Sequence, residues 1–306
     1  FSRVNVSLDW YTRTTKDLLM SKQLNSISGF SSLLTNVGQM RNTGVELEVR
    51  SNNIKTKDFS WTTAFNLSHN KNKILKLADL PWFVDGRYVR KEGYPFNTIY
   101  LREYAGVDPE TGSALYYDNQ QDENGNYTKN KVTDPGQASP IPLKDITPTI
   151  SGGFMNTFNY KFIDLSFNLS YSFGGYSYDN ASYILQDDGY SVISNKSTEQ
   201  RRRWQKPGDI TDVPRFVYGN KKGGNYNSSR AIHSTDHIRL KSLILGLNAP
   251  KAWLQKLGIG NARIYFSGTN LLTWAAYGQY DPEMSGVVGF YTPPLKTYAF
   301  GLELKF

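Results

Sequence analysis

Apolar and polar residues alternate along much of this chain of 306 residues, which is the pattern of a β-strand with one apolar face. The cleanest example runs from Leu165 to Phe173, where large apolar side chains alternate with serine and asparagine. The same pattern recurs along the chain and predicts eight strands of about ten residues. They are expected near 3–10, 45–50, 59–68, 150–160, 165–173, 238–247, 264–266 and 296–306.

Smaller departures from this pattern predict local features. Within Ile238–Leu247 the apolar phase shifts, which predicts a β-bulge near Lys241–Ser242. Short strands are expected at 98–104 and 114–117, inside a long irregular stretch. One short helix is expected around Ser197–Gln205, and a helical turn at Pro250–Gly260.

The connections between these strands are unequal in length. Three are short (51–58, 161–164 and 249–261), and four are long, at about 15–36, 71–148, 174–236 and 273–295. A soluble β-sandwich has mostly short loops, whereas an outer-membrane barrel joins its strands by short periplasmic turns and long extracellular loops. Ten residues tilted by about 45° also cross the hydrocarbon layer of a bilayer. The pattern therefore predicts an all-β chain, a segment of a transmembrane antiparallel β-barrel.

In such a barrel the apolar face meets lipid and the polar face lines the lumen. The expected lipid-facing residues are Val4, Val6, Leu8, Val45, Leu47, Val49, Phe59, Trp61, Phe65, Leu67, Leu165, Phe167, Leu169, Tyr171, Ile264, Phe266, Tyr298, Phe300 and Leu302. Aromatic residues near strand ends are expected to form the interfacial girdles, and they are Trp10, Trp61, Tyr160, Phe173 and Trp274.

Composition narrows the picture further. The chain has no cysteine, which excludes a disulfide scaffold, a thiolate metal site and a cysteine nucleophile. No run of 18 apolar residues is present, so the sequence predicts no transmembrane helix. The net charge of +8 suits an acidic partner, although only 20% of the residues are charged. The chain begins at Phe1 without a signal peptide, which suggests a mature protein or a fragment.

Candidate chemical sites are weak. His233 and His237 have the i, i+4 spacing of a helical metal site, but they straddle a loop-to-strand boundary without an acidic partner in register. The acidic segment Asp118–Tyr127 lacks the first and last ligands of an EF-hand, and a hairpin turn at Asn124–Gly125 fits it better. The basic cluster Arg201–Trp204 is typical of a solvated turn. We therefore expect no catalytic residue, metal, cofactor or nucleic-acid partner, and no enzyme activity.

Aromatic side chains in the long loops are the best candidates for binding. Aromatic rings can stack on sugars, and they are also favoured at protein interfaces, in a loop core or against a partner. The candidates for contact with a substrate or a lid are Trp82, Phe83, Tyr88, Tyr190, Trp204, Tyr226 and Tyr291.

Several short segments, taken in order along nearly the whole chain, resemble the SusC/RagA family of TonB-linked outer-membrane transporters. Each is only a turn or a piece of strand, and their order is what carries the resemblance. They are Asn36–Gly38 with Arg41–Leu47, Glu92–Pro95, Ala105–Gly112, Gly152–Phe154 with Asn159–Lys161, Val213–Arg215, Ile238–Lys241, Thr269–Thr273 and Tyr298–Phe306.

The resemblance implies a barrel of about 22 strands closed by an N-terminal plug, of which this chain would be the last eight strands. It implies import of oligosaccharides or peptides across the outer membrane, together with a SusD-like surface lipoprotein that acts as a lid. Energy would come through TonB, which would contact an N-terminal part that this chain lacks. No cofactor is implied.

The final strand has a further implication. Tyr298, Phe300, Leu302, Leu304 and Phe306 share one face. By resemblance to outer-membrane proteins in general, this alternating face and its terminal aromatic are the signal that the barrel-assembly machinery reads. A soluble domain seldom ends on such a strand, because an exposed apolar edge invites aggregation.

Two other classes remain open on the sequence alone. One is a cell-surface glycan-binding, lectin-like all-β protein. The other is a self-contained outer-membrane barrel of eight strands, whose interior would just be filled by side chains. The identity of the substrate is not written in this sequence, because specificity also rests on the plug and the lid.

Overall fold

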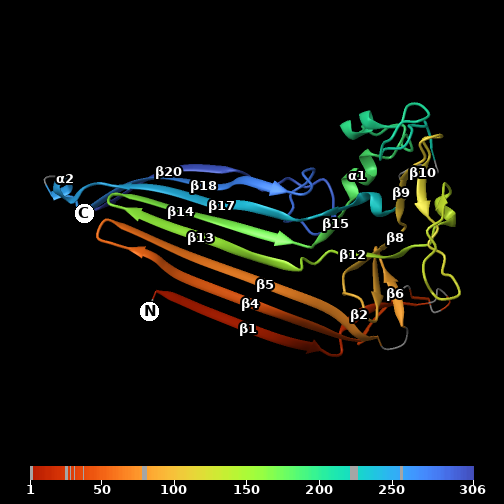
Figure 1. The fold of residues 1–306 in the computed structure, drawn as a ribbon, viewed down its shortest axis with the longest axis horizontal. Helices are drawn as coiled ribbons and strands as arrows, with labels where there is room; N and C mark the ends of the chain where they lie inside the picture. Colours follow the sequence, from red (N-terminus) through yellow and green to blue (C-terminus); the bar gives the residue numbers. More distant parts are fainter. Residues whose placement is uncertain are drawn as a thin grey trace.

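One large antiparallel sheet dominates the computed structural model, which describes residues 3–24, 27, 29–30, 32–36, 38–77, 81–220, 227–255 and 258–306 (Figure 1). All eight expected strands belong to it, and each pairs with the next one along this list. They are β1 (Val4–Thr15), β4 (Gly38–Lys55), β5 (Phe59–Leu77), β13 (Ile150–Tyr160), β14 (Ile163–Phe173), β17 (His237–Asn248), β18 (Asn261–Ala275) and β20 (Thr297–Lys305).

The register of the sheet gathers the apolar positions on one face, which we call the outward face. Residues paired directly across two strands lie on the same face. Leu8 pairs with Leu47 and Leu47 with Leu67, and further along the sheet Leu245 pairs with Phe266 and Phe266 with Phe300. Leu8, Leu245 and Phe300 (84%) are exposed, and Leu47, Leu67 and Phe266 are half-buried among their neighbours on this face. The expected lipid-facing residues therefore do share one face, and polar residues occupy the opposite, inner face.

The predicted bulge in β17 is confirmed. Its pairing with β18 shifts between Leu240 and Ser242, so that Lys241 has no partner in the β17–β18 ladder. Pairing with β14 shifts at the same place, between Asn168 and Leu169. One extra residue moves the apolar side chains from even to odd positions, which keeps Leu243 on the outward face.

Two glycines on the inner face are required by neighbouring tyrosines. A Cβ at Gly44 would lie 2.5 Å from the ring of Tyr11, and a Cβ at Gly301 would lie 2.2 Å from the ring of Tyr265. Each tyrosine lies across its glycine partner in the adjacent strand. The Tyr11 hydroxyl then donates to Asn70 on the next strand at 3.2 Å, so the ring links three strands.

The short and long connections lie at opposite ends of the sheet. The ends of the chain and α2 (Lys251–Gln255) lie at the short-connection end, and the remaining small elements gather at the long-loop end (Figure 1). Most of these small elements are strands. They are β2 (Leu19–Gln23), β3 (Ser32–Asn36), β6 (Trp82–Asp85), β7 (Tyr88–Lys91), β8 (Thr98–Leu101), β9 (Tyr104–Val107), β10 (Ala114–Tyr117), β11 (Lys131–Val132), β12 (Ile141–Asp145), β15 (Tyr176–Asp179), β16 (Ile232–Ser234) and β19 (Gly286–Val288).

Helical pieces complete the long-loop end. Among the described residues they include α1 (Asn180–Leu185) and the 3-10 turns η2 (Pro135–Gln137), η3 (Thr198–Arg202) and η4 (Ser229–Ala231). The helix expected at 197–205 is therefore a 3-10 turn, and the helical turn expected at 250–260 is confirmed as α2. No helix within the described residues has the length and apolar character needed to cross a membrane.

Some expected boundaries are wrong. Residues 51–55 belong to β4, so the short turn covers only 56–58, and residues 71–77 belong to β5. Segment 15–36 contains the hairpin of β2 and β3. β4 and β5 are 18 and 19 residues long, longer than expected. Their ends were missed because both faces carry polar side chains beyond the apolar band, so the alternation that indicates a strand disappears there.

The long loops build their own small core. Ile99, Leu101, Tyr178 and Ala231 are buried together between the sheet β12-β8-β7-β6 and the sheet β16-β15-β19. Within the described chain, β1 and β20 are the two edges of the large sheet and do not pair with each other. The eight strands thus form an open wall, and the alternative of a closed eight-stranded barrel does not agree with this topology.

Candidate functional site

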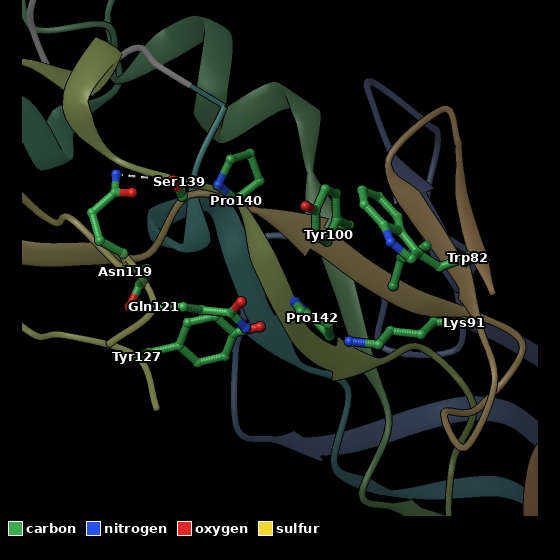
Figure 2. A pocket seen from close by; sticks show the side chains of 11 residues that line it. Trp82, Lys91, Tyr100, Asn119, Gln121, Tyr127, Ser139, Pro140 and Pro142 are labelled. Carbon is green, nitrogen blue, oxygen red and sulfur yellow. Dashed lines mark hydrogen bonds between the residues drawn. The ribbon is translucent and has the colours of Figure 1, made fainter. Parts of the chain in front are cut away.

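A cavity of about 470 Å³ opens among the long loops, beside the four-stranded sheet β12-β8-β7-β6 (Figure 2). It lies between that sheet and the hairpin around 119–127. Its lining residues are Trp82, Val89, Lys91, Tyr100, Asn119, Gln120, Gln121, Tyr127, Ser139, Pro140 and Pro142. We call this space the loop cavity.

Strand register explains which side chains reach the loop cavity. Trp82 pairs with Lys91 across β6 and β7, and Tyr100 pairs with Pro142 across β8 and β12, so these residues share one face of the small sheet. The rings of Trp82 and Tyr100 lie 5.9 Å apart between centroids, tilted by 49°. Trp82 is half exposed (45%), which leaves its ring accessible.

The opposite wall is a hairpin held by a carboxylate. Asp122 accepts hydrogen bonds from the backbone N–H groups of Asn124 and Asn126, and Gly125 adopts the positive φ of +79° that this turn needs. Hydrogen bonds from the backbone lower the pKa of the Asp122 carboxyl, and the bond from the N–H of Asn126 has the largest effect. An antiparallel bridge between Gln121 and Tyr127 closes the turn, which confirms the hairpin expected there.

The lining combines stacking surfaces with hydrogen-bonding groups. Trp82, Tyr100 and Tyr127 provide rings, and Gln121 provides a side-chain amide. Burial raises the pKa of Tyr100, so its hydroxyl stays protonated and can donate. Among the described residues that line the cavity, Lys91 is the only one with a formal charge. Such a surface can hold a polyhydroxylated or amide-rich ligand, because rings stack and amides and hydroxyls pair with its polar groups.

Of the aromatic candidates that the structure describes, Trp82 alone lines this cavity. Phe83 and Tyr88 lie on the other face of the small sheet. Phe83 packs against the buried pair Ile74 and Leu77, and Tyr88 packs against the core around Ile99. Their contacts are those of packing residues, because alternate residues of a strand point to opposite faces.

Trp204 is also a packing residue in this structure. Its indole N–H donates to the carbonyl of Pro109 at 2.8 Å. Its ring lies over Gly112, where a Cβ would be 2.4 Å from the ring atoms, and Gly112 has a φ of +68°. Tyr190 is half exposed and lies outside the loop cavity. Tyr226 lies outside the described residues.

A second cavity of about 570 Å³ contains Tyr291. It lies beside the loop between β18 and β20, with Phe290, Tyr277 and Tyr280 also in its wall. Arg239 of β17, an inner-face residue, contributes to the same wall, so this cavity borders the inner face of the large sheet. Phe290 and Tyr291 are both largely exposed.

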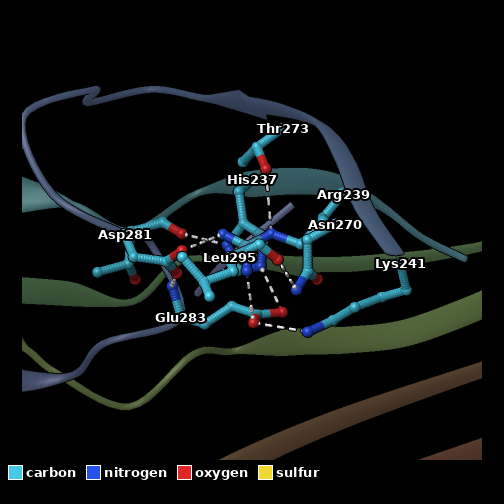
Figure 3. Close-up of polar contacts among 9 residues, drawn as sticks. His237, Arg239, Lys241, Asn270, Thr273, Asp281, Glu283 and Leu295 are labelled. Carbon is cyan, nitrogen blue, oxygen red and sulfur yellow. Dashed lines mark hydrogen bonds and ion pairs between the residues drawn. The ribbon is translucent and has the colours of Figure 1, made fainter. Parts of the chain in front are cut away.

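The same loop is tied to the inner face by ion pairs, which we call the inner latch (Figure 3). The Arg239 guanidinium bonds Asp281 at 2.6 Å, Glu283 at 2.8 Å and the hydroxyl of Thr273 at 3.1 Å. Lys241 reaches Glu283 at 2.6 Å. Arg239 and Asp281 have side-chain exposures of only 3% and 7%. This loop, expected among the long extracellular loops, is thus tied to the inner face of the wall.

The two histidines considered for metal binding have separate surroundings. His233 stacks on Tyr277 with 3.7 Å between ring centroids, whereas Nδ1 of His237 lies 2.8 Å from the carbonyl of Thr235. Across the residues that the structure describes, no group of three histidines or carboxylates is placed to hold a metal ion.

Comparison with known proteins identifies the architecture. No protein-family model matches the sequence. The TonB-dependent receptor P3 of Formosa agariphila is 33% identical over the whole chain, and the TonB-dependent receptor SusC of Bacteroides thetaiotaomicron is 28% identical over 99% of it. The structure of the RagAB peptide transporter superposes on 99% of this chain with a TM-score of 0.88 and 31% identity.

This chain is homologous over all or nearly all of its length to TonB-dependent receptors, SusC and the RagAB transporter chain among them. It spans about a third of the length of these relatives (32% of P3, 30% of SusC and 34% of the RagAB chain). The open eight-stranded wall is thus a segment of a transmembrane β-barrel, and a C-terminal segment of such a barrel fits it. Homology to longer proteins agrees with β1 and β20 as edges, since further strands of a larger barrel can pair with such edges.

Most of the residues that line the loop cavity were not predicted from the sequence. Tyr100, Tyr127, Gln121 and Lys91 were not singled out. For Tyr100 the sequence did give a clue, because this aromatic residue lies within a short strand expected at 98–104. The others come from separate segments that only the folded loops bring together.

Proposed function

We propose that this chain forms the C-terminal part of the barrel of a TonB-dependent importer in the outer membrane, and that its loop cavity contacts an oligosaccharide on its way to the lumen. The observation that carries the proposal is the paired rings of Trp82 and Tyr100, set among amide and hydroxyl groups at the long-loop end of a barrel wall. Sugar rings expose flat C–H faces that stack on aromatic side chains, and their hydroxyls pair with amides.

In this proposal the long loops lie outside the cell and the short turns in the periplasm. The plug and the TonB-contacting segment would be supplied by other parts of a protein three times as long. No catalytic residue or cofactor takes part, because transport needs only binding groups and energy delivered through TonB. This orientation follows the usual asymmetry of outer-membrane barrels.

We further propose that a SusD-like lipoprotein covers the long loops as a lid. Support comes from apolar side chains that stand exposed on the segment from 187 to 220, which is far from the barrel's lipid-facing band. Ile210 and Ile193 are exposed to 98% and 93%, and Tyr218 to 78%. Exposed apolar groups gathered on one segment mark a protein interaction surface more often than a free one.

A peptide is the second candidate substrate, because the chain is similar to that of the RagAB peptide transporter. The loop cavity separates the two possibilities by its chemistry. A sugar would depend on the faces of Trp82 and Tyr100, whereas an extended peptide would depend more on backbone hydrogen bonds, and Gln121 is suited to make them.

The test uses the complete transporter with its lid lipoprotein, purified and titrated with oligosaccharides and with peptide mixtures. Trp82→Ala should weaken oligosaccharide binding about tenfold, which corresponds to about 1.4 kcal/mol. Trp274→Ala, which removes an exposed indole from the outward face outside the cavity, is the matched control and should bind as the native protein does. Unchanged oligosaccharide affinity in Trp82→Ala would remove the loop cavity from the substrate path.

A further inference from the structure

An apolar groove lies on the outward face at the short-connection end of the sheet. It has a volume of about 440 Å³ and is built from strands β17, β18 and β20, the turn after β13 and the segment that contains α2. The residues that shape it are Phe162, Leu247, Pro250, Trp253, Ile264 and Leu302. We call it the turn groove.

The turn groove is held open by backbone contacts between neighbouring turns. The N–H of Asn248 donates to the carbonyl of Phe162 at 2.8 Å, and the N–H of Ala249 donates to the carbonyl of Ala262 at 2.8 Å. Leu254 anchors α2 by its buried side chain (5% exposed), which leaves the preceding Trp253 pointing away with 69% of its surface exposed. The concave shape is thus part of the fold.

The floor of the turn groove continues the lipid-facing surface. Leu247 pairs with Ile264 and Ile264 pairs with Leu302, so the three side chains form one row across three strands of the outward face. Because this face of the barrel wall meets the membrane, the groove opens onto acyl chains. Tryptophan is also enriched at the membrane–water boundary, where Trp253 lies.

Around the turns that follow β4 and β13, three exposed lysines outweigh one exposed carboxylate, that of Asp58. Lys161 directly precedes Phe162 and is exposed, with its ammonium group 5.4 Å from the centroid of the Tyr160 ring. Lys55 and Lys57 are exposed at the neighbouring turn of the same end. A cation beside an apolar groove at a membrane boundary complements a phospholipid, whose phosphate is anionic and whose chains are apolar.

We propose that the turn groove is a binding site for one phospholipid of the inner leaflet, with an acyl chain along Leu247, Ile264 and Leu302 and the phosphate near Lys161. This inference rests on the proposed orientation, in which the short turns face the periplasm. The lipid would seal the wall beside α2 and fix the position of Trp253.

The test measures quenching of tryptophan fluorescence by phospholipids with brominated acyl chains, in the complete transporter reconstituted into bilayers of phosphatidylethanolamine and phosphatidylglycerol. The contribution of Trp253 is obtained by comparison with Trp253→Phe. Trp10 is the reference, because it is exposed to the same extent (69%) on the outward face of β1 and samples unselected lipid. The contribution of Trp10 to the fluorescence is obtained in the same way, by comparison with Trp10→Phe.

The quenching of Trp253 should reach half its maximum at a severalfold lower fraction of brominated lipid than that of Trp10. Ala262→Phe, which fills the groove, should abolish this difference, and Lys161→Gln should shift the Trp253 curve toward that of Trp10. Val6→Phe adds the same ring elsewhere on the outward face and should change nothing.

Equal curves for Trp253 and Trp10 in the native protein, or a difference that persists in Ala262→Phe, would overturn the lipid site. Absence of quenching at both residues would instead overturn the contact of the outward face with lipid, and the site with it.

Discussion

The guanidinium of Arg239 on the inner face of β17 lies 2.6 Å from the carboxylate of Asp281, which belongs to the loop between β18 and β20. The pair is nearly buried and joins the barrel wall to a loop that borders the second cavity. Removing one partner of a buried ion pair leaves an uncompensated charge and costs about 3–5 kcal/mol.

Arg239→Met is therefore expected to release the loop from the wall. Hydrogen exchange of the backbone amides from 281 to 288 should become faster, while that of the central strands stays unchanged. Lys241→Met is the control, because Lys241 is about a third exposed (35%) and its ion pair with Glu283 should contribute only about 0–1 kcal/mol. Equal exchange in the native protein and Arg239→Met would mean that the latch does not hold the loop.

A pH dependence is expected at His233, which is stacked on Tyr277 at the long-loop end. Burial lowers the pKa of His233 below the value of about 6.5 that it has in an unfolded chain. The folded form then binds fewer protons than the unfolded form, so stability is full above about pH 6.5 and is lost as the pH falls. His233→Phe keeps a ring against Tyr277 and removes the titration. Its melting temperature should fall less than that of the native protein between pH 8 and pH 5, and parallel curves would contradict this.

The packing role of Trp204 is tested at Gly112, where the ring leaves no space for a Cβ. Gly112→Ala should strain the backbone by about 1–2 kcal/mol, because φ is positive there, and should also push the indole off Pro109. Gly125→Ala is the control, since its φ is +79° but nothing lies within 4 Å of the added Cβ. Trp204 fluorescence should shift to longer wavelength in Gly112→Ala alone. A shift of equal size in both variants would contradict the packing role.

The last strand is expected to carry an assembly signal. Phe300 in β20 and Phe306 directly after β20 are exposed to 84% and 88%. Deleting Phe306, or changing Phe300 to Asp, should lower the amount of folded barrel in the outer membrane, read by heat-modifiable migration on a gel. Glu303→Gln alters the inner face of the same strand and should assemble normally. Normal folded levels without Phe306 would exclude its role in the signal.

The alternation of apolar and polar residues was enough to predict the wall, because one face of every strand must be apolar where it meets lipid. It could not give the full length of β4 and β5. Residues such as Asn42 and Asn70 continue the strands beyond the apolar band, where both faces are polar and the period disappears.

Of the residues that line the loop cavity, only Trp82 was named from the sequence as a candidate for contact. Its neighbour Phe83 is equally aromatic, and the sequence alone does not say which of two adjacent rings faces a core and which faces the cavity. Tyr127 reaches the cavity from a different hairpin, whose position depends on tertiary packing. Family resemblance supplied the barrel but no residue of this cavity.

The most direct test concerns the sidedness of the wall. Single cysteines are placed at Asn124 in a long loop and at Lys57 in the turn between β4 and β5, and a membrane-impermeant maleimide is added to intact cells that make the complete transporter. We expect labelling of Asn124→Cys in intact cells, and of Lys57→Cys only after the outer membrane is permeabilised. Labelling of Lys57→Cys in intact cells, with Asn124→Cys protected, would contradict a barrel wall whose long loops face the cell exterior.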